Sequence, residues 1–267
     1  MENSSSKSAA EGYKEASLSV QKMDGAEFVQ RDVCPQVGDA ILDLGCGTGE
    51  LSAYLAELVG PKGKVVGVDP DKERIQLARK SHSGIKNLSF VGGSTTNFPG
   101  IGSESYDIVF SNYVLHWVAD KQQAFKNMYT SLNFGGKIGI QYVSHLPPFA
   151  LNAYKELNPE NVELLCQMVH CESKANIEQY CSSAGFETIR SYETSCINHV
   201  FENVASLLQW HWSTTHGVFD LSLVTEERLQ RYLAPYVNKE GQPCLDFRGM
   251  KEEAHVCRLI AVKQARN

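Results

Sequence analysis

The chain has 267 residues, of which 42% are hydrophobic and 21% are charged. This composition is typical of a globular protein that buries a substantial core. The net charge of −6 and the isoelectric point near 5.8 disfavour a nucleic-acid polymer as partner, because proteins that bind phosphate backbones usually present a basic surface.

No apolar run approaches the roughly 20 residues of a membrane span, and we expect no signal peptide and a cytoplasmic protein. Eight cysteines occur, but none forms a C-x-x-C pair or a zinc-finger spacing. We therefore expect reduced thiols and no metal site. The small, polar opening MENSSSKSAAEG predicts a disordered tail over residues 1–12 and a single domain over 13–267.

From residue 37 to 143, short apolar runs alternate with amphipathic segments, which predicts β-α-β units on a parallel sheet covered by helices. The expected strands span 39–45, 64–70, 87–93, 106–112 and 137–143. The expected helices span 49–60, 71–82 and 120–133. Ligands of such sheets bind beyond the carboxyl ends of the strands.

The second half of the chain predicts more helix than sheet. Its expected elements are a proline-broken helical stretch over 144–170, a helix and a strand over 172–195, helices over 203–219 and 225–237, and a closing strand over 254–264. We interpret 144–170 and 201–232 as a cap over the core at 37–143.

The stretch LDLGCGTGE follows the first strand with glycines at alternate positions. Such glycines let a ligand approach the backbone closely, and turns of this kind often bind phosphate. Here Asp43 would repel a pyrophosphate. Glu50 stands where a dinucleotide fingerprint has its third glycine, which argues against a nicotinamide oxidoreductase. Asp69 ends the second strand, where a carboxylate can accept both ribose hydroxyls of an adenosine. A nucleoside with cationic groups and no phosphate, S-adenosylmethionine, fits this combination.

The LDLGCGTG turn, the strand end VGVDP and the segment LNFGGKI resemble class I S-adenosylmethionine-dependent methyltransferases in order and spacing. The resemblance covers roughly residues 37 to 143. It implies an α/β Rossmann-like fold with a mostly parallel seven-stranded sheet, an antiparallel last strand and a helical cap. It also implies S-adenosylmethionine as the cofactor. The cofactor contacts that we expect are Asp43, Gly45, Gly47, Asp69, Pro70, Ser94, Thr95 and Asn112.

The chain departs from the family pattern at two positions. Ser94 stands where the family usually has an acid near the adenine amino group, and a hydroxyl is a weaker acceptor than a carboxylate. Phe134 replaces the usual proline of the L-K-P-G-G turn, which we expect to change only that turn.

The flanking segments SLSVQKMDGAEFV and SNYVLHWVAD look like those of the juvenile hormone acid methyltransferases, which methylate the carboxylate of farnesoid acids. That likeness implies that Gln21 and Trp117 hold the substrate carboxylate. Both are neutral donors, so they can orient an anion without quenching its nucleophilicity. His116, next to Trp117 in the sequence, is the third candidate. Each of the three side chains also has a purely structural interpretation, as a core or helix-surface residue.

The expected function is methyl transfer to a small molecule, with the carboxylate of an apolar acid as the first hypothesis. A carboxylic acid has a pKa of about 4 to 5, so it needs no general base. The second hypothesis is an amine or hydroxyl acceptor, which needs a base. The histidines available for that role are His116, His145, His211 and His216. The third is a non-catalytic, cofactor-binding partner protein. The segment QWHWSTTHGVF suits the wall of an apolar pocket, and we expect a monomer or homodimer.

Overall fold

The computed structural model of the chain describes residues 21–194, 200–215, 217–239, 241, 243–247 and 256–265. The predicted tail at 1–12 lies outside these residues, as does His216. The single domain over 13–267 stays a prediction.

Within the described ranges, seven strands form one sheet in the order β3-β2-β1-β4-β5-β7-β6. The strands are β1 (Ala40–Leu44), β2 (Lys64–Asp69), β3 (Leu88–Gly92), β4 (Tyr106–Asn112), β5 (Leu132–Val143), β6 (Glu187–Thr194) and β7 (Val256–Val262). The first five strands pair in parallel, and β7 runs antiparallel to both β5 and β6. The predicted mostly parallel sheet with an antiparallel last strand is confirmed.

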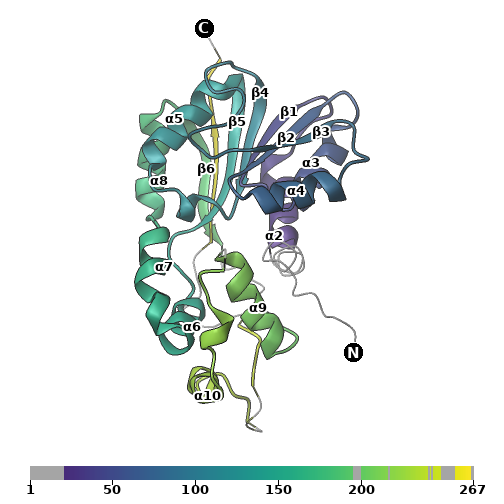
Figure 1. Cartoon of the computed structure of the whole chain (residues 1–267). Helices are drawn as coiled ribbons and strands as arrows, with labels where there is room; N and C mark the ends of the chain where they lie inside the picture. The colour runs from purple at the N-terminus through teal and green to yellow at the C-terminus, as the bar shows by residue number, and fades with distance from the viewer. Residues whose placement is uncertain are drawn as a thin grey trace.

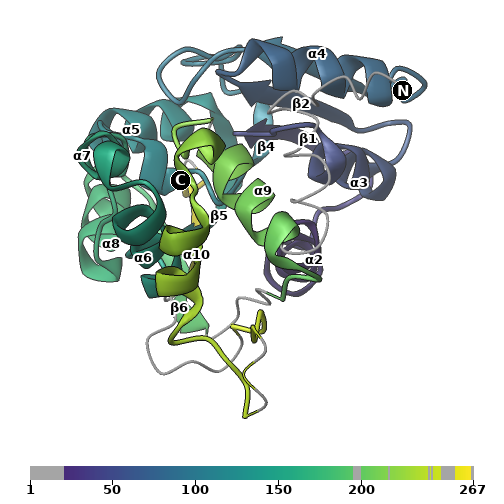
Figure 2. The same ribbon diagram turned by 60° about the horizontal axis from the view of Figure 1, so that its bottom comes forward.

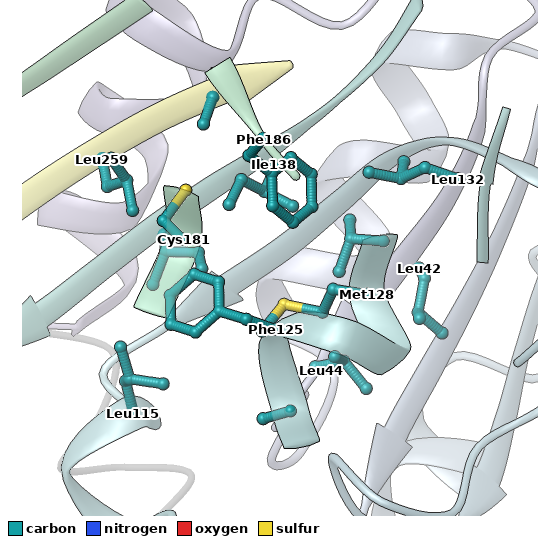
Figure 3. Close-up of a cluster of buried hydrophobic side chains, with 14 of the residues drawn as sticks. Leu42, Leu44, Leu115, Phe125, Met128, Leu132, Ile138, Cys181, Phe186 and Leu259 are labelled. Carbon is teal, nitrogen blue, oxygen red and sulfur yellow. The ribbon is translucent and has the colours of Figure 1, made fainter. Parts of the chain in front are cut away.

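Helices cover both faces of the sheet (Figure 1). One face carries α2 (Gln21–Phe28), η1 (Val29–Val33), α3 (Glu50–Val59) and α4 (Lys72–Ser81), and the other carries α5 (Lys121–Ser131) and α8 (Lys174–Ser183). The residues of β1 pack against the helices on both faces of the sheet, because successive side chains of a strand point to opposite faces. Leu42 and Leu44 join the cluster under α5 and α8, with Phe125 and Met128 (Figure 3), while Ile41 joins the cluster under α2 and α3.

Several boundaries differ from the sequence prediction: the helix expected over 203–219 ends at Thr214, the one expected over 225–237 ends at Leu233, and the junction of α5 and β5 is shifted. Helix α5 ends at Ser131, and β5 begins at Leu132 rather than at 137. The LNFGG segment is therefore the start of a strand. The reason is a tertiary pairing: the Gly135 N–H donates to the Lys263 carbonyl at 2.7 Å, and the Lys263 N–H donates to the Gly136 carbonyl at 2.8 Å.

The cap consists of short helices beyond the carboxyl ends of the parallel strands, and Figure 2 shows them in front of the sheet. They are α6 (Pro148–Leu157), η3 (Pro159–Asn161), α7 (Val162–Met168), α9 (Val204–Thr214), η4 (Leu221–Leu223) and α10 (Glu226–Leu233). They share a hydrophobic cluster of their own, which includes Phe149, Tyr154, Leu207, Phe219 and Tyr232. The cap also contacts the sheet layer, because Arg74 Nη2 of α4 donates to the Ser213 carbonyl of α9 at 2.8 Å.

Candidate functional site

The turn between β1 and α3 brings backbone close to the end of the sheet. Gly45, Gly47 and Gly49 all have positive φ angles, of 78°, 55° and 88°, which side chains disfavour. A Cβ at Gly45 would lie 2.1 Å from Cγ2 of Val114, so only glycine fits there. Helix α3 starts directly after Gly49 with no side-chain cap, so no capping side chain satisfies its first N–H groups.

Asp69, at the end of β2, is almost fully buried beside this turn. Its Oδ2 accepts from the Gly47 N–H at 2.9 Å, and its Oδ1 accepts from the Asp71 N–H at 2.9 Å. A carboxylate has about four acceptor positions, so capacity for further hydrogen bonds remains on the cavity side. Two ribose hydroxyls match that capacity, and the residues present therefore fit the adenosine part of S-adenosylmethionine.

Asp43 points behind the turn. Its Oδ2 accepts from Ser52 Oγ at 2.5 Å, and its side chain is buried without lining the cavity. The pKa of Asp43 is raised to about 7, because burial and, to a smaller extent, the charge of Asp69 outweigh the opposing hydrogen bond from Ser52. This hydrogen bond joins the end of β1 to α3, on either side of the turn. Direct contact of Asp43 with a cofactor stays a prediction.

A cavity that is partly open to solvent lies where the turn, the strand ends and the cap meet. A concave site with a largely apolar lining and a few polar groups is typical of small-molecule binding. Its sheet side includes Val114 and Val143 and, from α4, Arg74. Its cap side is largely apolar and aromatic, with Leu146, Ala150, Tyr154, Leu165, Trp210 and His211.

Six of the predicted site residues meet at this cavity. They are Gly45, Asp69, Pro70, Asn112, His116 and Trp117. Their convergence from three strand ends and from η2 (Leu115–Trp117) follows from the parallel order of β1, β2 and β4.

Four predicted residues are not among those that line the cavity: Asp43, Gly47, Ser94 and Thr95. The Ser94 hydroxyl instead lies 3.1 Å from Thr96 Oγ1, within its own loop. The Thr95 carbonyl accepts from Asn127 Nδ2 at 3.0 Å. Gln21 begins α2, but its side chain lies outside what the structure describes, so its role stays a prediction.

His116 and His211 are both buried at the cavity wall. Burial lowers the pKa of each to about 3, and the charge of Lys121 adds to the effect at His116. Both rings are therefore neutral at pH 7. His116 Nδ1 and His211 Nε2 have no hydrogen-bond partner among the described residues. His145 is exposed and does not line the cavity.

Asn112 is held by a chain of hydrogen bonds that reaches the N-terminal helix. Its Oδ1 accepts from Gln141 Nε2 at 2.9 Å, and Gln141 Oε1 accepts from Arg258 Nε at 2.6 Å. Arg258 Nη2 then pairs with Glu27 Oε2 of α2 at 2.9 Å. A buried charge needs such partners, and these partners fix α2 against the same strands that carry Asn112.

Sequence reasoning missed the roles of Arg74 and Arg258. Arg258 was visible as a single charge within the apolar strand VCRLIAV, a pattern that requires buried partners. Arg74 shares the buried face of α4 with Ile75 and Ala78, and helical spacing places it there. No group of three or more possible metal ligands occurs among the described residues, and no described helix is long and apolar enough to cross a bilayer.

Comparisons with known proteins give a family and a fold. The sequence matches the family described as "Methyltransferase domain" over residues 35–220. It is 30% identical over 152 residues to the juvenile hormone acid O-methyltransferase of Bombyx mori, which covers 53% of this chain and 52% of that protein. It is 39% identical over 129 residues to the arsenite methyltransferase of Homo sapiens, which covers 44% of this chain and 34% of that protein.

The chain thus matches about half or less of the length of these two relatives. Among solved structures, a methyltransferase in complex with the Haloferax volcanii Trm112 methyltransferase activator has a TM-score of 0.62 at 17% identity, covering 96% of each chain. That likeness establishes the Rossmann-like methyltransferase fold.

The two neutral histidines predict a loss of stability in acid. Their folded-state pKa values, about 3, lie below the ordinary 6.5, so their contribution is complete above pH 6.5 and is lost as the pH falls toward 3. At pH 5 we expect each histidine to lower the free energy of unfolding by about 2 kcal/mol. Urea unfolding at neutral pH and at pH 5 measures this loss.

The control is the double variant H116Q/H211Q, which should lose less stability between the two pH values. Asp43, whose pKa is raised, changes stability in the opposite direction, but equally in both proteins. Equal losses in the two proteins would contradict the neutral state of the histidines.

Proposed function

Since this chain belongs to the family of class I S-adenosylmethionine-dependent methyltransferase domains, we propose that it transfers a methyl group from S-adenosylmethionine to the carboxylate of a small apolar acid. The proposal extends the family assignment in two respects. It makes this chain an active enzyme, and it names the acceptor.

The cofactor side of the cavity supports the first part. Asp69 would accept the ribose hydroxyls, Gly45 would allow the ligand close to the backbone, and Pro70 would lie against the base. When bound, S-adenosylmethionine supplies an electrophilic methyl group on a cationic sulfur. The cap wall of the cavity is largely apolar, and an apolar surrounding strengthens electrostatic interactions.

The observation that carries the choice of acceptor is the poor basicity of the described cavity. His116 and His211 have pKa values of about 3, so neither accepts a proton readily at neutral pH. The Tyr154 hydroxyl donates to Thr215 Oγ1, and burial raises its pKa to about 12. The Asp69 carboxylate already accepts two N–H groups. An amine or alcohol would have to lose a proton, whereas a carboxylate arrives ionised.

Neutral donors near the strand ends suit an anionic acceptor. Trp117 lines the cavity beside His116, and an indole N–H, like the amide NH₂ predicted for Gln21, orients a carboxylate without neutralising it. The α2 helix that carries Gln21 is fixed to this region through Glu27 and Arg258. The printed name of the Bombyx mori relative, an acid O-methyltransferase, agrees with such an acceptor.

The arsenite methyltransferases among the relatives suggest a different acceptor, but the cavity does not favour it. Arsenic(III) prefers soft thiolate ligands, and no cysteine is among the described residues that line the cavity. The apolar cap wall instead suits an acceptor with a hydrocarbon body.

The direct test incubates the purified chain with isotope-labelled S-adenosylmethionine and matched small acids, amines and phenols, and identifies the labelled product by mass. We expect methyl esters, with no rise in rate between about pH 6 and 8 that depends on His116 or His211, because the pKa values of both histidines lie near 3. A rate that rises through this range and is lost in His116→Gln would contradict the carboxylate and favour an amine or alcohol. Cofactor binding without any labelled product would favour a non-catalytic partner protein.

Asp69→Asn should weaken binding of S-adenosylhomocysteine by about 2–3 kcal/mol, because the carboxylate makes charge-assisted hydrogen bonds that an amide cannot replace. Isothermal calorimetry measures the change. Asp120→Asn is the matched control, since Asp120 caps α5 and does not line the cavity. Equal affinities for the Asp69 and Asp120 variants would overturn the assignment of Asp69.

Trp117→Phe should raise the KM for the acid about tenfold, because the ring remains while the indole N–H donor is lost. Binding of S-adenosylhomocysteine should stay within about twofold of the wild type. Steady-state kinetics and calorimetry on the same preparation separate the two effects. A KM unchanged by the substitution would show that the indole N–H does not contact the acceptor.

A further inference from the structure

Lys121, the first residue of α5, is a buried cation in an unfavourable place. Its side chain is 3% exposed, and it lies in the first turn of a helix, where the helix dipole disfavours positive charge. Burial adds a cost of desolvation and lowers the pKa of the ammonium below its ordinary value. A cation at this position therefore needs specific hydrogen bonds to be stable.

Those hydrogen bonds go to backbone carbonyls of two segments that carry cavity residues. Lys121 Nζ donates to the Val118 carbonyl at 2.7 Å and also to the His170 carbonyl. Val118 directly follows η2, and His170 lies just after α7, which contributes Leu165 to the cavity lining. The ammonium therefore joins the start of α5 to the ends of η2 and α7.

A further hydrogen bond secures the other side of Trp117. The His170 N–H donates to the His116 carbonyl at 2.7 Å, so the carbonyls directly before and after Trp117 both accept hydrogen bonds. The Trp117 backbone N–H donates to the Val114 carbonyl at 2.8 Å. Its indole ring packs against the His116 imidazole, with 5.1 Å between ring centroids. The backbone and the ring of Trp117 are therefore both held by the protein itself.

We propose that Lys121 is a positioning residue, which holds Trp117 in the orientation in which its indole N–H contacts the acceptor carboxylate. The inference rests on the proposed function for the role of Trp117. Lys121 is not among the residues that line the cavity, so it acts on the acceptor only through η2. Without the ammonium, the carbonyls of Val118 and His170 lose a donor in a partly buried place. Such a loss is costly, and η2 should shift to reduce it.

Lys121→Met tests the proposal by kinetics, because methionine keeps an unbranched side chain and removes the ammonium. We expect the KM for the acid to rise about tenfold with kcat within about threefold, which is the pattern of a lost contact to the bound acid. Affinity for S-adenosylhomocysteine should stay within about twofold, because the cofactor contacts come from other elements. Lys126→Met is the matched control, since Lys126 is exposed on the same helix, and it should keep the wild-type KM.

A double-variant cycle with Trp117→Phe separates positioning from a general structural effect. If Lys121 acts through the indole N–H, Lys121→Met adds nothing once that N–H is gone. The double variant should then raise KM about tenfold, not the roughly hundredfold of independent effects. An additive effect would overturn the proposal, as would a wild-type KM in a Lys121→Met protein that thermal melting shows to be folded.

The indole signals give a readout that does not depend on catalysis. The chain has three tryptophans, and the indole signal that is missing from the nitrogen–proton spectrum of Trp117→Phe identifies Trp117. In the wild type without ligands, we expect this indole to be as rigid as folded backbone, with an order parameter of about 0.85. In Lys121→Met its signal should shift and broaden, while in Lys126→Met it should match the wild type.

A mobile Trp117 indole in the wild type would overturn the proposal even if Lys121→Met does not fold, and so would an indole signal that this variant leaves unchanged. The proposed function fails in a different way, if the wild type methylates amines or phenols and no acid. The indole signals still test in that case whether Lys121 holds Trp117.

Discussion

The carboxylate of Asp69 is the contact on which the arrangement of the site depends. It joins the glycine turn that follows β1 to the start of α4 after β2, through the N–H groups of Gly47 and Asp71. A charge buried at this depth is stable only when hydrogen bonds compensate its lost hydration. The backbone of the turn is therefore held in place, and Asp69 itself lines the cavity.

The cavity divides into two chemically different halves. The sheet half is built from backbone turns and polar side chains at the strand ends, including Asp69 and Asn112. The cap half is a second hydrophobic cluster, packed around Phe149 and Phe219. Two neutral histidines, His116 and His211, are buried polar side chains that line this cavity. Burial suppresses their basicity, and His116 Nδ1 and His211 Nε2 are buried without a hydrogen-bond partner among the described residues.

The buried guanidinium of Arg258 links strand β7 and helix α2 to the residues of the site. Arg258, on the antiparallel strand β7, reaches Gln141 and through it Asn112, and it pairs with Glu27 of α2. Removing one partner from such a group would leave an uncompensated charge. The strand that completes the sheet thus also sets the position of the N-terminal helix relative to the cavity.

Local patterns in the sequence were enough for the strands, their parallel pairing, the glycine turn and the placement of Gly45 and Asp69 at one end of the sheet. Those features depend on residue spacing and on backbone chemistry within a few residues. The tertiary structure decided the early start of β5, which pairs with backbone at Lys263. It also decided the orientation of Asp43 toward Ser52 and the neutrality of His211. These depend on neighbours brought together by folding, because burial and hydrogen-bond partners have no period along the chain.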